Sequence, residues 1–169
     1  MADVEVRELT AVDSRLLEQF TNLAIWTPQV LPAPEEDSYS NPALRQYWQH
    51  YGGVDDHGFV ALSSEAAIGA AWARIIRGDM PGYGRIDDRT PELAMAVVPT
   101  WRGRGVGTQL LATLLDHLTV AGYQSVSLSV QKANPAVRLY KRFGFATVRV
   151  YDHDYVMVRG LTPIDDSAA

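Results

Sequence analysis

The sequence has no cysteine among its 169 residues. That absence excludes disulfide bonds, thiolate metal sites and a cysteine nucleophile, all of which need this side chain. No apolar run approaches the ~20 residues that cross a bilayer, and the first nine residues, MADVEVREL, alternate and carry acidic side chains, unlike a signal peptide. We therefore expect a cytoplasmic protein with no membrane partner.

Positive charge is also in short supply. The chain carries 15 Lys and Arg against 20 Asp and Glu, a formal net charge of −5. Because nucleic-acid binding is driven by the neutralisation of phosphates, this balance argues against a nucleic-acid partner, although it allows a local basic patch. His50, His57, His117 and His153 show no metal-ligand spacing such as H-E-x-x-H, so we expect structural or surface histidines and no metal ion.

The order of predicted elements indicates a mixed sheet. The chain is long enough to bury the core of one domain, which we place at residues 1–161, followed by a frayed tail at 162–169. Strands interleaved with helices predict a fold of the α/β or α+β class. Alternating or apolar runs predict strands at residues 4–9, 57–64, 67–78, 91–99 and 124–130, and two more within 145–160. Capping residues and helical spacing predict helices at residues 14–24, 42–51, 106–121 and 135–143.

The stretch WRGRGVGTQLL, at residues 101–111, sets three glycines and two arginines between a strand and a helix. This arrangement offers backbone N–H groups to a phosphate at the positive end of a helix. Glycine suits such a loop because a Cβ would hold the anion away and restrict positive φ angles. Arg102 and Arg104 add charge at the same place. A tight turn that only starts a helix is the alternative interpretation.

The spacing of these glycines distinguishes between the known phosphate loops. No GK[ST] follows, so the Walker pattern fails, and the dinucleotide pattern fails because Thr108 stands where a third small residue is needed. A nucleotide-binding domain is therefore disfavoured. The pattern R-x-x-G-x-G, formed by Arg102, Gly105 and Gly107, resembles instead the coenzyme A pyrophosphate loop of the GNAT superfamily of N-acetyltransferases. The later stretch VSLSVQKANPAVRLYKRFGF is similar to the strand and helix that follow in that family, and the two motifs cover residues 91–145, about a third of the chain.

The resemblance implies a GNAT-like fold, a twisted and mostly antiparallel mixed sheet of about seven strands flanked by about four helices. Its central strands, here 92–98 and 124–130, would be parallel and splay apart, with acetyl-CoA bound between them. Asn134 would contact the cofactor, although capping of the following helix explains this residue as well. The cofactor-binding residues that the resemblance implies are Met95, Ala96, Val97, Arg102, Gly103, Arg104, Gly105, Val106, Gly107, Thr108 and Asn134.

The resemblance also implies an acetyl-CoA-dependent N-acetyltransferase that moves the acetyl group to a primary amine. With no cysteine to carry the group, we expect direct attack in a ternary complex. Tyr140 occupies the family's position for the general acid, whereas the helix face that it shares with Val137 and Phe143 would by itself make it a core residue. Glu92 is the candidate general base, provided that burial raises its pKa from the usual value near 4.3. A solvated strand start is the other interpretation of Glu92.

No motif in the sequence identifies the amine that accepts the acetyl group. We expect its site in the proline-rich loop at 27–42 or in the loop at 77–90. Tyr47 and the other aromatic residues of the first half are expected mainly in the core, with one or two as candidates for a wall of the acceptor site. The acidic pairs at 55–56 and 87–88 are expected on the solvated surface, where they would favour a cationic amine if they face the acceptor entrance. A catalytically inactive coenzyme A-binding regulatory or interaction domain is the alternative function. Either a monomer or a homodimer fits the sequence.

Overall fold

A seven-stranded sheet organises the protein, of which the computed structural model describes residues 3–25 and 38–162. The strands lie in the order β1-β2-β3-β4-β5-β7-β6, and the sheet is open at both edges. Their bounds are β1 (Glu5–Glu8), β2 (His57–Ser63), β3 (Ala66–Arg74), β4 (Glu92–Val97), β5 (Ser125–Gln131), β6 (Ala146–Val150) and β7 (Asp154–Gly160). The predicted number of strands is confirmed.

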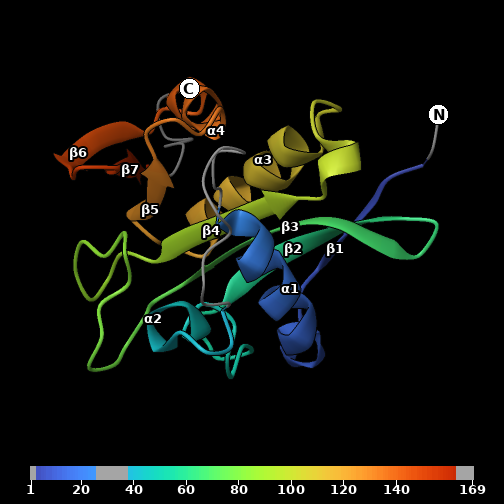
Figure 1. The fold of residues 1–169 in the computed structure, drawn as a ribbon, viewed down its shortest axis with the longest axis horizontal. Coiled ribbons are helices and arrows are strands. Elements are labelled where there is room, and N and C mark those ends of the chain that lie inside the picture. The colour runs from blue at the N-terminus through green and yellow to red at the C-terminus, as the bar shows by residue number, and fades with distance from the viewer. Residues whose placement is uncertain (1–2, 26–37, 163–169) are drawn as a thin grey trace, which may run out of the picture.

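Helices cover both faces of this sheet (Figure 1). In the described residues the α-helices are α1 (Ser14–Ala24), α2 (Pro42–Arg45), α3 (Val106–Val120) and α4 (Ala136–Arg142), with 3-10 turns η1 (Ala11–Asp13) and η2 (Pro99–Trp101). Helix α3 turns a leucine stripe toward the sheet, because residues three and four apart share one helical face. The stripe consists of Leu110, Leu111, Leu114, Leu115 and Leu118, all buried.

The central strand β4 is covered on both sides. Successive side chains of a strand point to opposite faces. Leu93, Met95 and Val97 accordingly pack in the core that contains α3, whereas Ala94 and Ala96 pack in the core that contains α1. Any opening beside β4 therefore lies between two helical layers.

β4 and β5 run parallel and part almost at once. In the described sheet they pair at Glu92 and Ser127, where Ser127 N–H also donates to Pro91 O at 3.0 Å. The other neighbouring strands are antiparallel. The prediction of a mixed, mostly antiparallel sheet with a splayed parallel pair at its centre is thus confirmed.

The predicted helix over residues 42–51 is wrong beyond its first turn, which is α2. Side chains from β3 bind the carbonyl groups that would continue it. Trp72 Nε1 donates to Tyr47 O at 2.8 Å. Arg74 donates to Gln46 O at 3.0 Å. Tertiary hydrogen bonds therefore override the local helical pattern here.

The acidic pair Asp55 and Asp56 is not a solvated run. The two carboxylate oxygens of Asp56 accept hydrogen bonds from the Arg74 guanidinium at 3.0 and 3.1 Å. The side chain of Asp56 is only 7% exposed and that of Arg74 only 12%. Asp55 accepts from Tyr123 at 2.7 Å and from Arg77 at 2.6 Å. Strand β3 ends at Arg74, earlier than predicted. Residues 27–37 of the proline-rich loop and 163–169 of the tail lie outside the described residues.

Candidate active site

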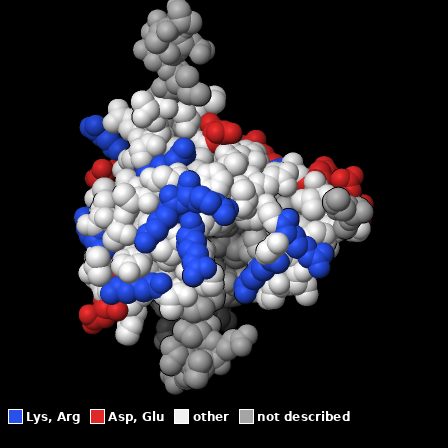
Figure 2. All heavy atoms as spheres, turned by 90° about the horizontal axis from the view of Figure 1, so that it is seen from above, with Lys and Arg blue, Asp and Glu red and all other residues white. Residues whose placement is uncertain are grey.

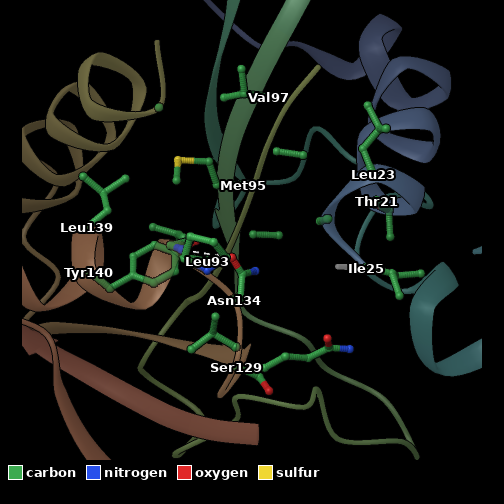
Figure 3. Close-up of a pocket in the computed structure, with 18 of the residues that line it drawn as sticks. Thr21, Leu23, Ile25, Leu93, Met95, Val97, Ser129, Asn134, Leu139 and Tyr140 are labelled. Carbon is green, nitrogen blue, oxygen red and sulfur yellow. Dashed lines mark hydrogen bonds between the residues drawn. The ribbon is translucent and has the colours of Figure 1, made fainter. Parts of the chain in front are cut away.

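A cavity of about 940 Å³ opens where β4 and β5 part (Figure 3). Its floor is formed by Leu93–Val97 of β4 and Ser129–Gln131 of β5. In Figure 3, Leu139 and Tyr140 lie on one side of β4, and Thr21, Leu23 and Ile25 lie on the other. The glycine-loop wall consists of Trp101, Arg102, Gly103, Gly105, Gly107, Thr108, Asn134, Pro135, Ala136, Leu139, Tyr140 and Arg142. The tyrosine wall consists of Thr21, Leu23, Ala24, Ile25, Asn41, Leu44, Tyr47 and Tyr83.

Two glycines of the loop are required by its turn. Gly103 and Gly105 have positive φ angles of 71° and 83°, a conformation that favours glycine. Gly105 is the N-cap of α3, so the first N–H groups of this helix have no carbonyl partner four residues earlier. A Cβ on either glycine would meet no atom of the described residues within 4 Å. The loop therefore leaves its backbone donors accessible.

Gly107, the third glycine of the loop, is not explained by the turn. Gly107 lies inside α3 without a positive φ, and a Cβ there would sit 3.7 Å from Met95 and Val97, an ordinary contact. Nothing in the described residues requires glycine at this position, although alanine is the better helix former by ~1 kcal/mol. A ligand that approaches the helix backbone closely would account for glycine at this position. The tight-turn interpretation thus explains two of these three glycines.

The structure brings most of the predicted cofactor residues to the cavity, with two exceptions. Arg104 stacks its guanidinium over the Trp101 ring, 5.1 Å from the centroid, and Val106 is buried in the core. Arg102 lines the cavity, and its Nε donates to Val97 O at 3.0 Å, which ties the loop to the end of β4. The others that line the cavity are Met95, Ala96, Val97, Gly103, Gly105, Gly107, Thr108 and Asn134.

Helix α4 presents Tyr140 to the cavity, and Asn134 lies two residues before this helix. Tyr140 is 6% exposed, and its ring meets Phe145 edge-on with centroids 5.6 Å apart. Burial raises the pKa of Tyr140 above its ordinary value, so its hydroxyl keeps its proton at neutral pH. Asn134 Oδ1 accepts the N–H of Ala136 at 2.9 Å, which is a helix cap, and Asn134 also lines the cavity. Both expected roles of Asn134 therefore fit its position.

Glu92 is buried beneath the tyrosine wall and does not itself line the cavity. Its Oε1 accepts from the Tyr47 hydroxyl and from Gly84 N–H, the latter at 2.8 Å. Burial raises the pKa of Glu92 to about 7, and the two hydrogen bonds oppose that rise. The interpretation as a solvated strand start is wrong. The role of general base stays a prediction, for which a pKa near neutrality is suitable.

The contacts of Tyr47 and of the loop at 82–84 with Glu92 are the features that sequence reasoning missed. Tyr47 is buried, as expected of most of these aromatic residues, and it also lines the cavity and holds Glu92. A Cβ on Gly82 would lie 2.0 Å from Glu92 Oε2, and one on Gly84 would lie 2.7 Å from the backbone of Leu128. These glycines let the loop lie directly on the carboxylate. The closely spaced glycines were the available signal, but nothing local links them to Glu92.

Positive charge gathers near the glycine-loop wall. Figure 2 shows Lys and Arg side chains clustered on the upper face of Figure 1, where α4 and the start of α3 lie. Helix α4 carries Arg138, Lys141 and Arg142, and the glycine loop carries Arg102 and Arg104. In a chain with a net charge of −5, such a local patch favours an anionic ligand.

Two negative findings apply to residues 3–25 and 38–162. No helix there is long and apolar enough to cross a membrane. No three side chains of His, Cys, Asp or Glu there are grouped so that they could hold a metal ion.

Comparisons of sequence identify relatives of the chain. The profile of the Acetyltransferase (GNAT) family matches residues 17–145. A mycothiol acetyltransferase from Brachybacterium faecium is 38% identical over 88 residues, 51% of this chain and 25% of that protein. A ribosomal protein bS18-alanine N-acetyltransferase from Haemophilus influenzae is 36% identical over 61 residues, 36% of this chain and 42% of that protein. The matched stretch thus spans less than half of either relative.

Solved structures share the fold. The PaiA N-acetyltransferase of Thermoplasma acidophilum, in complex with coenzyme A, superimposes with a TM-score of 0.68 at 18% identity, covering 94% of this chain and 99% of that one. The GNAT domain of S. lividans PAT gives a TM-score of 0.68 at 20% identity, covering 94% and 90%. At these identities the likeness concerns the fold alone.

Proposed function

The chain belongs to the GNAT acetyltransferase family, and on that basis we propose that it transfers the acetyl group of acetyl-CoA to a primary amine by direct attack in a ternary complex. The observation that carries the proposal is the cavity between β4 and β5, which has accessible backbone donors on one wall and a buried Glu92–Tyr47 pair behind the other. A donor and an acceptor can occupy such a cavity at the same time.

The glycine-loop wall is the proposed donor site. The first N–H groups of α3 and the guanidinium of Arg102 would hold the pyrophosphate of acetyl-CoA. Gly107 would let that anion approach the helix backbone, which explains why no side chain stands there. The pantetheine would lie along β4 where this strand has left β5, with free backbone groups to pair with it. The thioester would then end near Tyr140.

The tyrosine wall is the proposed acceptor site. A primary amine is a cation at neutral pH and must lose a proton before its nitrogen can attack. Glu92, with a pKa raised to about 7, would take that proton. Asp154, the one carboxylate that lines the cavity in the described residues, would attract the ammonium group.

The chemistry then needs an acid for the leaving group. The amine nitrogen forms a bond to the thioester carbonyl carbon, and the carbon–sulfur bond breaks with its electrons on sulfur. Tyr140 would give its proton to that sulfur and recover one from the new amide nitrogen, which still carries an extra proton. Because burial keeps Tyr140 protonated, it would donate only as the thiolate develops.

The test is thiol release from acetyl-CoA in the presence of a panel of amines, followed with a thiol-reactive dye. The protein gives no background because it has no cysteine. The panel includes peptides that begin with alanine, since one relative is named for an alanine substrate. We expect amine-dependent release that falls by ~10²-fold or more in Tyr140→Phe, because general acid catalysis contributes that much. Binding of coenzyme A without release for any amine would favour the inactive coenzyme A-binding domain.

A further inference from the structure

Tyr47 stands between Glu92 and the cavity. Glu92 does not line the cavity, whereas Tyr47 does, and its hydroxyl donates to Glu92 Oε1. We propose that Tyr47 relays protons between an amine held in the cavity and Glu92. This inference rests on the acetyl transfer proposed above and adds to it a proton-transfer role for Tyr47, which the sequence does not assign.

The loop at 82–84 blocks direct access to the carboxylate. Gly84 N–H donates to Oε1 at 2.8 Å, and Gly82 lies so close to Oε2 that a Cβ there would be 2.0 Å away. Glu92 is in consequence 4% exposed. A general base must be within hydrogen-bond reach of the proton that it takes, or be connected to it through one intervening group. Tyr47 has the position of that group.

The hydrogen bonds of Tyr47 fix the direction of the relay. A phenolic hydroxyl has one proton to donate and lone pairs with which to accept. The proton is directed to Glu92, and one lone pair accepts the N–H of Tyr83 at 2.9 Å. The second lone pair is left for a donor in the cavity. The Tyr83 ring stacks on that of Tyr47, with centroids 6.4 Å apart and planes 11° apart, and holds it in this orientation.

Proton transfer through these groups balances without a further reactant. The ammonium group breaks one N–H bond and gives the proton to the Tyr47 oxygen, while the Tyr47 O–H proton passes to Glu92 Oε1. The amine becomes neutral, Tyr47 ends with one proton as before, and Glu92 becomes a neutral acid. After the product leaves, Glu92 returns its proton along the same path.

The surroundings of Glu92 support its part in this step. Burial raises the pKa of Glu92 to about 7, so its carboxylate is basic enough to receive the proton. In the described residues, only the hydrogen bonds from Tyr47 and Gly84 act against that rise, and no charged side chain contributes. Loss of the Tyr47 hydroxyl would therefore raise the pKa of Glu92 further.

A competing path runs along β5. Glu92 Oε2 and Ser127 Oγ are both buried without a hydrogen-bond partner in the described part of the chain, and the two residues are paired in register. Ser129, on the same face of β5, lines the cavity. A proton path on this side would depend on the Ser127 hydroxyl and not on Tyr47. Ser127→Ala is therefore the matched control.

The test is the pH dependence of kcat/KM with an amine that the wild-type protein acetylates. Tyr47→Phe keeps the ring that stacks on Tyr83 and removes the hydroxyl. We expect this variant to lower kcat/KM by ~10²-fold, the usual contribution of a proton-transfer group. In the wild-type protein kcat/KM should fall as the pH drops below about 7, where Glu92 becomes protonated, and in Tyr47→Phe this acidic limb of the profile should move to higher pH. The Kd for acetyl-CoA should not change. Glu92→Gln should abolish the limb, and Ser127→Ala should leave both rate and limb as in the wild type.

Two results would overturn the relay and leave acetyl transfer intact: a wild-type rate and limb in Tyr47→Phe, or an equal loss in Ser127→Ala. No turnover by the wild-type protein with any amine would overturn the proposed function and this inference with it. If Tyr47→Phe does not fold, difluorotyrosine placed at position 47 keeps the ring and lowers the hydroxyl pKa. A change in kcat/KM and in the acidic limb of its pH profile would then support the relay. If neither changes, the relay is refuted.

Discussion

The two walls of the cavity differ in how the chain assembles them. The glycine-loop wall takes its backbone donors from the consecutive residues 101–108, from the end of η2 to the first turn of α3, and the rest from α4 and the two residues before it. The tyrosine wall combines the end of α1, the turn that carries Tyr47 and the loop that carries Tyr83. One wall is a local motif, whereas the other exists only when distant segments have folded together. A sequence can therefore reveal the first more readily than the second.

The walls also differ in electrostatics. The glycine-loop wall is open, with cations nearby, as suits the binding of an anion that stays partly in water. Behind the tyrosine wall, Glu92 is removed from water, and its pKa rises because burial penalises the charged form. Phosphate binding needs accessible donors, and a neutral-pH base needs enclosure. The two requirements explain why the two functions are assigned to opposite walls.

The largest effect on stability is expected at Gly84, in the loop that covers Glu92. A Cβ on Gly84 would lie 2.7 Å from the carbonyl carbon of Leu128 and 3.1 Å from Glu92 Oε1. Because backbone must move, Gly84→Ala should lower the free energy of unfolding by ~1–3 kcal/mol in urea titrations. Gly78→Ala is the control, since a Cβ there meets nothing within 4 Å. Equal stability of the two variants would contradict the packing described.

The next effect concerns the pH dependence of stability, which for Glu92 is opposite in sign to that of a carboxylate whose pKa is lowered on folding. The pKa of Glu92 is raised from 4.5 in the unfolded chain to about 7 in the folded protein. Between these values the folded state binds more protons, so its free energy of unfolding falls as the pH rises, by at most ~1.4 kcal/mol per pH unit. The stabilisation is complete below the unfolded value and is lost as the pH rises through the folded value. Glu92→Gln should remove this slope from urea unfolding curves, and an identical slope in both proteins would argue against a raised pKa.

The smallest effect is a difference in stability and in acetyl-CoA affinity between alanine variants of Gly107 and Gly105. Gly107→Ala should keep or slightly raise stability, by up to ~1 kcal/mol, since alanine favours the helix, while it weakens acetyl-CoA binding. Gly105→Ala should lower stability by ~1–2 kcal/mol, because an L side chain would have to adopt the φ of 83°. Thermal melts and calorimetric titration with acetyl-CoA measure both quantities. Unchanged affinity in Gly107→Ala would leave that glycine without a ligand-based explanation.

Most of the fold could be predicted because its signals are local. Each strand shows its own alternation or apolar run, and α3 shows its leucine stripe without reference to other elements. The helix over 42–51 failed for the opposite reason. Its carbonyl groups are bound by Trp72 and Arg74, which belong to a strand that follows much later in the chain. No local pattern reports such a contact.

The candidate site divides in the same way. The glycine spacing and the position of Tyr140 predicted one wall, and the structure brings those residues to one cavity. Glu92 was a candidate on the condition that it is buried, but the sequence could not decide between burial and a solvated strand start, since burial depends on Tyr47 and the loop at 82–84. Tyr47 is 45 residues from Glu92 in sequence and Gly84 is 8 residues from it, and no helical or strand periodicity connects either of them to the carboxylate. The contacts on which the proposed proton path rests are therefore visible only in three dimensions.

The central claim is that donor and acceptor occupy the cavity together and that the acetyl group passes directly between them. Initial rates measured while both acetyl-CoA and an accepted amine are varied test this claim most directly. Direct transfer predicts double-reciprocal lines that intersect, because no product leaves before both substrates are bound. Parallel lines would mean that coenzyme A leaves first and that a residue of the protein carries the acetyl group, which would contradict the account.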